Sequence, residues 1–197
     1  LKLEPKNAEV LNNLGLTFKA IGDFKKANEC FENSISIKPN FAEAFNNMAL
    51  SLKEERKFEK AIVSLEKAIA LKNNYAEAYY NLGNVYNLLG ELEKSINMFT
   101  RAIDIKSDYF DAYNNLGAVY NLKKDYDKAY QNIQKAISLN PNNADAYNNL
   151  GTSALNLNKE EEAITHFNKA LSIDPASIKA YSNLCGLFEK SNKIEEF

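Results

Sequence analysis

Six asparagines recur at a fixed spacing of 34 residues, and their amide side chains could bind the backbone of another polypeptide. A primary amide offers one carbonyl acceptor and two N–H donors, which match the acceptor and donor of a peptide unit. Each net hydrogen bond contributes only about 0.5–1.5 kcal/mol, so several amides would have to act together. Such a row would bind an extended chain with little regard to its side chains. The six residues, called the asparagine ladder below, are Asn13, Asn47, Asn81, Asn115, Asn149 and Asn183.

An acidic row accompanies the ladder. Its residues stand four positions before the asparagines, and residues i and i+4 share one face of a helix. Carboxylates there could contact Ser or Thr hydroxyls, Lys or Arg of a ligand. The acidic row consists of Glu9, Glu43, Glu77, Asp111 and Asp145, and Lys179 replaces the acid in the sixth copy.

A second polar position directly precedes each ladder asparagine. Its occupants are Asn12, Asn46, Tyr80, Asn114, Asn148 and Ser182. Tyr80 is the aromatic exception at this position. It could anchor a ligand in the manner of an interface hot spot, or it could be an ordinary surface tyrosine.

Two helices are predicted in each 34-residue period. In residues 76–89, Tyr79, Leu82 and Tyr86 recur at helical spacing, and Gly90 ends the pattern. Prolines between periods favour a break, because proline cannot continue a helix. The second apolar stripe of the same period consists of Leu92, Ile96, Phe99 and Ile103. The chain is therefore predicted to be all-α.

The period divides the whole chain into similar units. We place them at residues 8–41, 42–75, 76–109, 110–143 and 144–177, with a partial unit at 178–197 and the tail of a preceding unit at 1–7. Small residues recur at one position of each predicted first helix, where two helices could approach closely. These are Gly15, Ala49, Gly83, Gly117, Gly151 and Cys185, so we expect Cys185 to be buried.

The units resemble the tetratricopeptide repeat. In the fourth unit the matching residues are Tyr113, Leu116, Gly117, Tyr120, Ala129, Ile133, Ala136 and Pro141. The resemblance covers essentially the whole chain and implies a single domain at 1–197, a right-handed α-solenoid of five full repeats plus one extra first helix. It also implies that the first helices line the concave surface.

The asparagine ladder on such a surface resembles the superhelical arm of the O-linked N-acetylglucosamine transferases. In that family a concave asparagine ladder holds the backbone of the acceptor polypeptide, with acidic residues alongside. Lys179 departs from that pattern, and the sequence contains no transferase domain. The resemblance therefore implies peptide binding and not the transferase activity. A row of solvated asparagines in an Asn-rich chain would give the same pattern without any ligand.

Other classes of function are disfavoured by the composition. With 24 Lys and Arg against 26 Asp and Glu, the chain lacks the basic face that nucleic acid requires. No stretch is long and apolar enough for a membrane span. A single His, two distant Cys and no glycine-rich phosphate loop predict no enzyme, no metal site and no cofactor. Few cysteines favour a reducing, cytoplasmic location.

The sequence leaves three functions open. The first is a non-enzymatic interaction module that binds an extended polypeptide, neutral or basic rather than acidic, because the acidic row would repel an acidic tail. The second is a substrate-recruiting arm of a larger enzyme such as a protein glycosyltransferase. The third is a scaffold that self-associates through its ends. Residues 1–7 and 193–197 match partial units, which predicts that the chain is a piece of a longer protein with uncapped ends.

Overall fold

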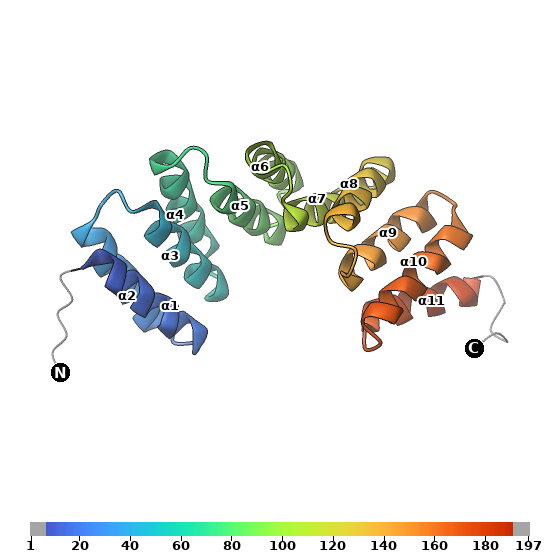
Figure 1. Ribbon diagram of the computed structural model, residues 1–197, viewed down its shortest axis with the longest axis horizontal. Helices are drawn as coiled ribbons and strands as arrows, with labels where there is room; N and C mark the ends of the chain where they lie inside the picture. The colour runs from blue at the N-terminus through green and yellow to red at the C-terminus, as the bar shows by residue number, and fades with distance from the viewer. Residues whose placement is uncertain (1–6, 191–197) are drawn as a thin grey trace. The chain divides into compact units, whose positions relative to one another are not determined.

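The computed structural model describes residues 7–190, which contain eleven α-helices and no strand (Figure 1). The helices are α1 (Ala8–Ala20), α2 (Phe24–Ile37), α3 (Ala42–Glu54), α4 (Phe58–Leu71), α5 (Ala76–Leu88), α6 (Leu92–Ile105), α7 (Phe110–Leu122), α8 (Tyr126–Leu139), α9 (Ala144–Asn156), α10 (Glu160–Ile173) and α11 (Ile178–Lys190). They form five helical hairpins and one further first helix, which confirms the predicted all-α repeat fold.

The chain divides into two compact structural units, Leu1–Ile105 and Lys106–Phe197, called the first and the second unit below. The 34-residue units of the sequence are called repeats from here on. The prediction that the chain is one domain stays a prediction. Partial repeats are predicted at the two ends of the chain. Of these, only Asn7 and α11 lie within the described residues.

Each hairpin turns at a residue with positive φ, one residue before the helix N-cap. Gly22 and Gly90 occupy this position with φ of 80° and 74°, as their lack of Cβ allows. Arg56, Lys124 and Asn158 adopt the same conformation with φ of 59°, 63° and 59°. The hairpin geometry therefore imposes a left-handed residue even where the sequence supplies one with a Cβ.

Side-chain caps fix several helix starts. Asn7 accepts from the backbone N–H groups of Glu9 and Val10, and Asn143 accepts from that of Ala146. An Asn or Asp cap satisfies a donor that the first helical turn leaves open.

Small residues let the two helices of a hairpin approach closely, as predicted. A Cβ placed on Gly15 would lie 2.6 Å from Cε1 of Phe31, and one on Gly151 would lie 2.6 Å from Cε1 of Phe167. Both rings are fully buried. The expectation that Cys185 is buried was wrong, since the structure leaves it exposed. A second helix covers this position in the earlier repeats, and no such helix follows α11 within the described residues.

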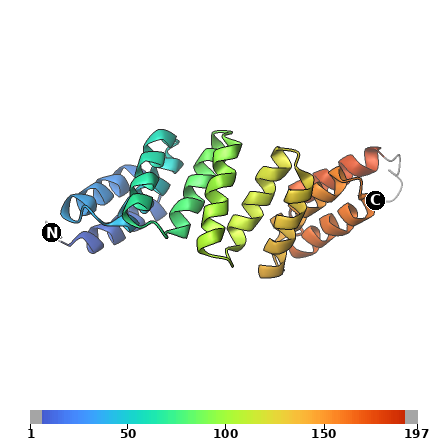
Figure 2. The same ribbon diagram turned by 90° about the horizontal axis from the view of Figure 1, so that it is seen from above.

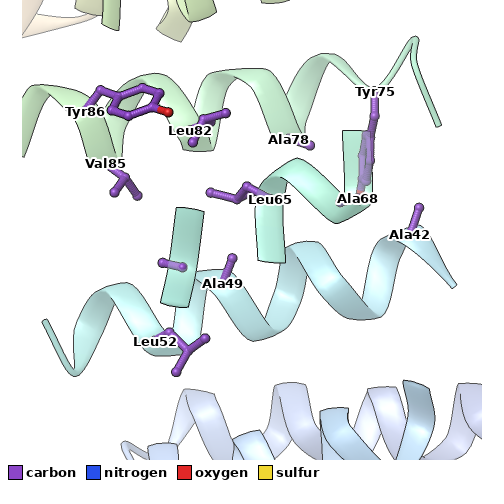
Figure 3. Packing of buried hydrophobic residues seen from close by; sticks show 11 residues of the cluster. Ala42, Ala49, Leu52, Leu65, Ala68, Tyr75, Ala78, Leu82, Val85 and Tyr86 are labelled. Atoms are coloured by element: carbon purple, nitrogen blue, oxygen red, sulfur yellow. The ribbon is translucent and has the colours of Figure 1, made fainter. Parts of the chain in front are cut away.

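The cores lie between a hairpin and the first helix of the next repeat. Figure 3 shows this for α3, α4 and α5, where Leu65, Leu82 and Val85 lie between the helices with several alanines, and Leu52 on α3 belongs to the same cluster. Leu65 and Val85 are almost wholly inaccessible to solvent. Alanines at the remaining contacts keep the helices close enough for these branched side chains to interdigitate.

First helices of successive repeats lie side by side within each unit. α1 approaches α3 and α3 approaches α5, and in the other unit α7 approaches α9 and α9 approaches α11. Figure 2 gives a second view of the same helices. The residues of the ladder therefore stand on adjacent helices inside each unit, as a binding row requires.

Candidate functional site

Side-chain hydrogen bonds connect the asparagine ladder from one repeat to the next. In each case the Nδ2 group of a ladder asparagine donates to Oδ1 of the asparagine that precedes the ladder position in the previous repeat. The four bonds are Asn47 to Asn12 at 3.0 Å, Asn81 to Asn46 at 2.9 Å, Asn149 to Asn114 at 3.1 Å and Asn183 to Asn148 at 2.9 Å.

The accepting asparagines are structural residues that sequence reasoning did not assign to the site. Asn12, Asn46 and Asn148 are buried, each at most 6 % exposed. A buried amide without a partner is costly, so the inter-repeat bond satisfies the acceptor and fixes the ladder side chain at the same time. The recurrence of two adjacent asparagines at a spacing of 34 residues was the available signal.

The ladder amides keep groups that can bind a ligand. Asn47, Asn81, Asn149 and Asn183 are half-buried, and their Oδ1 atoms and second N–H groups make no hydrogen bond within residues 7–190. Asn13, at the first rung, is exposed. One acceptor and one donor of each connected amide therefore remain without a partner there, the pair that a peptide unit needs.

Lysines neutralise part of the acidic row. The ion pairs are Glu9 with Lys38 at 3.7 Å, Glu43 with Lys72 at 3.3 Å and Asp145 with Lys179 at 3.2 Å. Glu77 and Asp111 are exposed and make no ion pair among the described residues. All three pairs are solvent-exposed, so each contributes little to stability and a ligand cation could displace the lysine.

Burial and two carboxylates of the acidic row together raise the pKa of a tyrosine beside it. Tyr75 is buried, and Lys72 Nζ lies 4.5 Å from the centre of its ring. Desolvation, and then the charges of Glu77 and Glu43, raise the pKa of Tyr75 to about 12. Glu77 and Glu43 therefore both disfavour ionisation of the Tyr75 hydroxyl, which stays neutral at physiological pH.

Tyr80 is not a free surface side chain. It is half-buried, and its ring lies 5.8 Å from that of Phe99 at an interplanar angle of 45°. Tilted aromatic pairs at this distance stabilise the fold beyond the area they bury. Tyr80 is thus partly a packing residue of its own hairpin.

In the described part of the chain, no group of three or more His, Cys, Asp or Glu residues could hold a metal ion. His166 packs against Tyr130 and Tyr147, with ring centres 6.4 and 6.3 Å away. No described helix is long and apolar enough to cross a membrane.

Repeated two-helix hairpins with small residues at the crossing define a helical-repeat protein. Sequence profiles of the tetratricopeptide repeat match residues 8–41 and 108–176, and a TPR repeat profile matches 51–90 and 83–123. The chain belongs to the tetratricopeptide repeat family. Repeats of this family serve generally as non-catalytic modules of protein interaction.

Solved structures of the same fold include a MamA protein with 30% sequence identity and a TM-score of 0.75, in an alignment that covers 87% of this chain and 94% of that one. YrrB, described as a TPR protein with an unusual peptide-binding site, is 18% identical, with a TM-score of 0.73 and coverage of 91% and 93%. PilF of Pseudomonas aeruginosa is 17% identical, with a TM-score of 0.85 and coverage of 95% and 86%. A search of curated protein sequences found no match.

Proposed function

We propose that the chain is a non-enzymatic module that binds an extended polypeptide along its first helices through the asparagine ladder. The observation that carries the proposal is the bond from four of the six ladder amides to the previous repeat, as from Asn81 to Asn46 at 2.9 Å. The bond orients the amide before any ligand arrives. The acceptor and the second donor of these four amides make no hydrogen bond within residues 7–190, so they stay available to a ligand.

Orientation in advance matters because binding must otherwise immobilise each side chain. An interface side chain with many rotamers loses about 0.5–1.5 kcal/mol when it is fixed. A net hydrogen bond contributes a similar amount. The inter-repeat bond removes most of that loss, so each ladder contact can add to the affinity. A solvated row of freely rotating asparagines would gain almost nothing.

The charges favour a neutral or basic ligand. Glu77 and Asp111 are available for Lys, Arg or hydroxyl groups, and the lysines paired with Glu9 and Glu43 can yield to a ligand cation. An acidic segment would face carboxylates at the same positions and would be repelled.

The direct test is the binding of a fluorescent random-peptide pool to the wild type and to the Asn81→Ala/Asn115→Ala/Asn149→Ala variant. A matched control replaces three exposed asparagines of the second helices, Asn33, Asn97 and Asn168, by Ala. The proposal requires binding by the wild type and the control and loss in the ladder variant, with equal helicity by circular dichroism. Equal binding by all three proteins would show that the ladder is only solvated surface.

A variant that leaves the inter-repeat bonds intact keeps this test interpretable. Asn13 is exposed and makes no side-chain hydrogen bond within the described residues. Asn13→Ala should therefore leave stability unchanged. It should weaken peptide binding only slightly, because no inter-repeat bond orients this amide before the ligand arrives.

Self-association is a second candidate, favoured by an apolar face on α1. Val10 and Leu14 are 48 % and 39 % exposed, whereas the equivalent Ala78 and Leu82 are buried against the preceding repeat. The face would suit another copy of α11, which exposes Ile178 and Tyr181. Sedimentation velocity over a range of concentrations tests this. A strict monomer would exclude it, and a dimer lost in Leu14→Glu would support it.

A further inference from the structure

A groove with a volume of about 530 Å³ lies between α2 and α4, on the second helices and away from the ladder residues. Its base comes from α3, where Met48 is half-buried and Leu52 is buried. It lies wholly within Leu1–Ile105. Pockets of this size accommodate a few side chains of a ligand.

One wall of the groove carries a polar residue where the other repeats are apolar or aromatic. Asn28 on α2 corresponds to Ile62, Ile96, Tyr130 and Ile164. Its Nδ2 group donates to Oε2 of Glu55 at 2.6 Å. Its Oδ1 atom is buried and has no hydrogen-bond partner within the described residues. A buried acceptor of this kind is costly unless a donor reaches it.

The opposite wall carries an apolar residue where the other repeats are polar. Val63 on α4 is 65 % exposed, and it corresponds to Glu29, Asn97, Gln131 and Thr165. Asn28 is smaller than the tyrosine and the isoleucines at its position, and Val63 adds an exposed apolar side chain to the rim. Both departures from the chain's own repeat pattern thus meet at one place.

The equivalent groove of the other unit shows what the repeat pattern gives without these changes. It lies between α8 and α10, has a volume of about 370 Å³, and is lined by Tyr130, Thr165 and His166. Tyr130 fills the place of Asn28, and its hydroxyl donates to Oε2 of Glu162 at 2.9 Å. No exposed apolar side chain lines that groove.

Charges around the first groove favour a cation. Glu55 is paired with Lys57 at 2.8 Å. The other charged side chains of the rim make no ion pair within the described residues, and they are Glu29, Glu32, Glu59, Lys25 and Lys60. Acids are therefore in excess, and a basic donor would also satisfy Asn28 Oδ1.

We propose that the α2–α4 groove is a second interaction surface, which takes a short amphipathic helix of another protein. An apolar side chain of that helix packs on Val63 and Leu52, and an Arg or Lys one turn away donates to Asn28 Oδ1. Helices commonly bind grooves between helices through apolar anchors at such spacings. This surface is independent of the ladder, so a partner here can be held while a peptide occupies the first helices.

The test uses helical probe peptides of defined sequence with the whole chain. The first probe carries Leu and, four residues later, Arg on an Ala- and Gln-rich helix, and matched probes carry Ala for Leu or Glu for Arg. Binding is followed by fluorescence anisotropy, and the contact is located by NMR shifts of the Asn28 side-chain amide. The protein variants are Val63→Glu and Asn28→Ile, the latter being the residue that three other repeats have. The controls are Asn97→Glu, the equivalent exposed position on α6, and Asn81→Ala in the ladder.

The proposal expects the Leu/Arg probe to bind, and about tenfold weaker binding on losing Leu, Arg or Val63, the size of one hot-spot contact. Asn97→Glu and Asn81→Ala should bind as the wild type does. Equal affinity of the three probes, or no change in Val63→Glu, would overturn it. A dimer that Val63→Glu dissociates, with no probe binding, would also overturn it in favour of a second copy as the occupant. Loss in Asn81→Ala alone would assign the probe to the ladder instead.

Discussion

Gly83 lies directly against the ring of Phe99, and a Cβ at this glycine would be 2.8 Å from both Cδ1 and Cε1 of the ring. Phe99 is fully buried, so in a close-packed interior its ring can move only by displacing its neighbours. Gly83→Ala should therefore destabilise the chain by about 1–3 kcal/mol, the range for overpacked cores. Urea unfolding followed by circular dichroism measures the loss.

Gly186 on α11 is the matched control, because nothing lies within 4 Å of the Cβ position there. Alanine is a better helix former than glycine by up to about 1 kcal/mol. Gly186→Ala should leave stability unchanged or raise it. If both substitutions destabilised the chain equally, the close helix crossing at Gly83 would not be the cause.

The bond between Asn46 and Asn81 should appear as an energetic coupling between repeats. We expect a double-mutant cycle of Asn46→Ala and Asn81→Ala to give a coupling free energy of about 0.5–1.5 kcal/mol. The pair Asn33→Ala and Asn81→Ala, which are not in contact, should be additive. Additivity in both cycles would mean that the inter-repeat bond does not connect the ladder in solution.

The left-handed turn at Lys124 predicts a stabilising substitution. A Cβ in this conformation costs roughly 1–2 kcal/mol, and glycine avoids that cost but loses more backbone entropy on folding. Lys124→Gly should therefore stabilise the second unit by about 0.5–1 kcal/mol. The converse Gly90→Lys should destabilise the first unit. Thermal unfolding measures both changes. The prediction requires the melting temperature to rise in Lys124→Gly and to fall in Gly90→Lys.

His166 should make stability depend on pH. Burial lowers the pKa of His166, against a smaller opposing effect of Glu162, and Lys159 lowers it slightly further. The surrounding titratable groups are Tyr130, whose pKa burial raises, and Glu162, whose pKa the Tyr130 hydrogen bond lowers. Both keep their charge state between pH 5 and 8.

The lowered pKa of His166 determines how stability changes with pH. The unfolded chain has its imidazole near pKa 6.5 and takes up a proton before the folded chain does. Stability is therefore greatest above about pH 6.5 and declines as pH falls towards the lower pKa of the folded state. His166→Asn, which copies the equivalent Asn132, should flatten the profile between pH 5 and 7. An unchanged slope would exclude His166 as its source.

Much of the fold followed from the spacing of residues along the chain. The 34-residue period and the small residues at Gly15 and Gly83 predicted paired helices and their close crossings. These features are local, because helical periodicity and side-chain size act within one hairpin. The asparagine ladder was visible for the same reason, since one substitution pattern repeats in every copy.

The exposure of Cys185 could not be read in this way. Its position matched the buried small residues of the other repeats, but burial depends on whether a second helix covers the site. The positive φ of Arg56 was also hidden, because neither residue type nor neighbours indicate it. The hairpin imposes that conformation and overrides the intrinsic preference of arginine.

The sequence by itself determined the repeat, the helix faces and the positions of the ladder, because each depends on residues within one period. Only the tertiary structure decided that Asn46 holds Asn81 and that Asn28 and Val63 meet across one groove. In both pairs the residues are 35 positions apart and lie on different helices. Their geometry depends on how far one hairpin is displaced against the next, and side-chain packing across the whole interface sets that displacement.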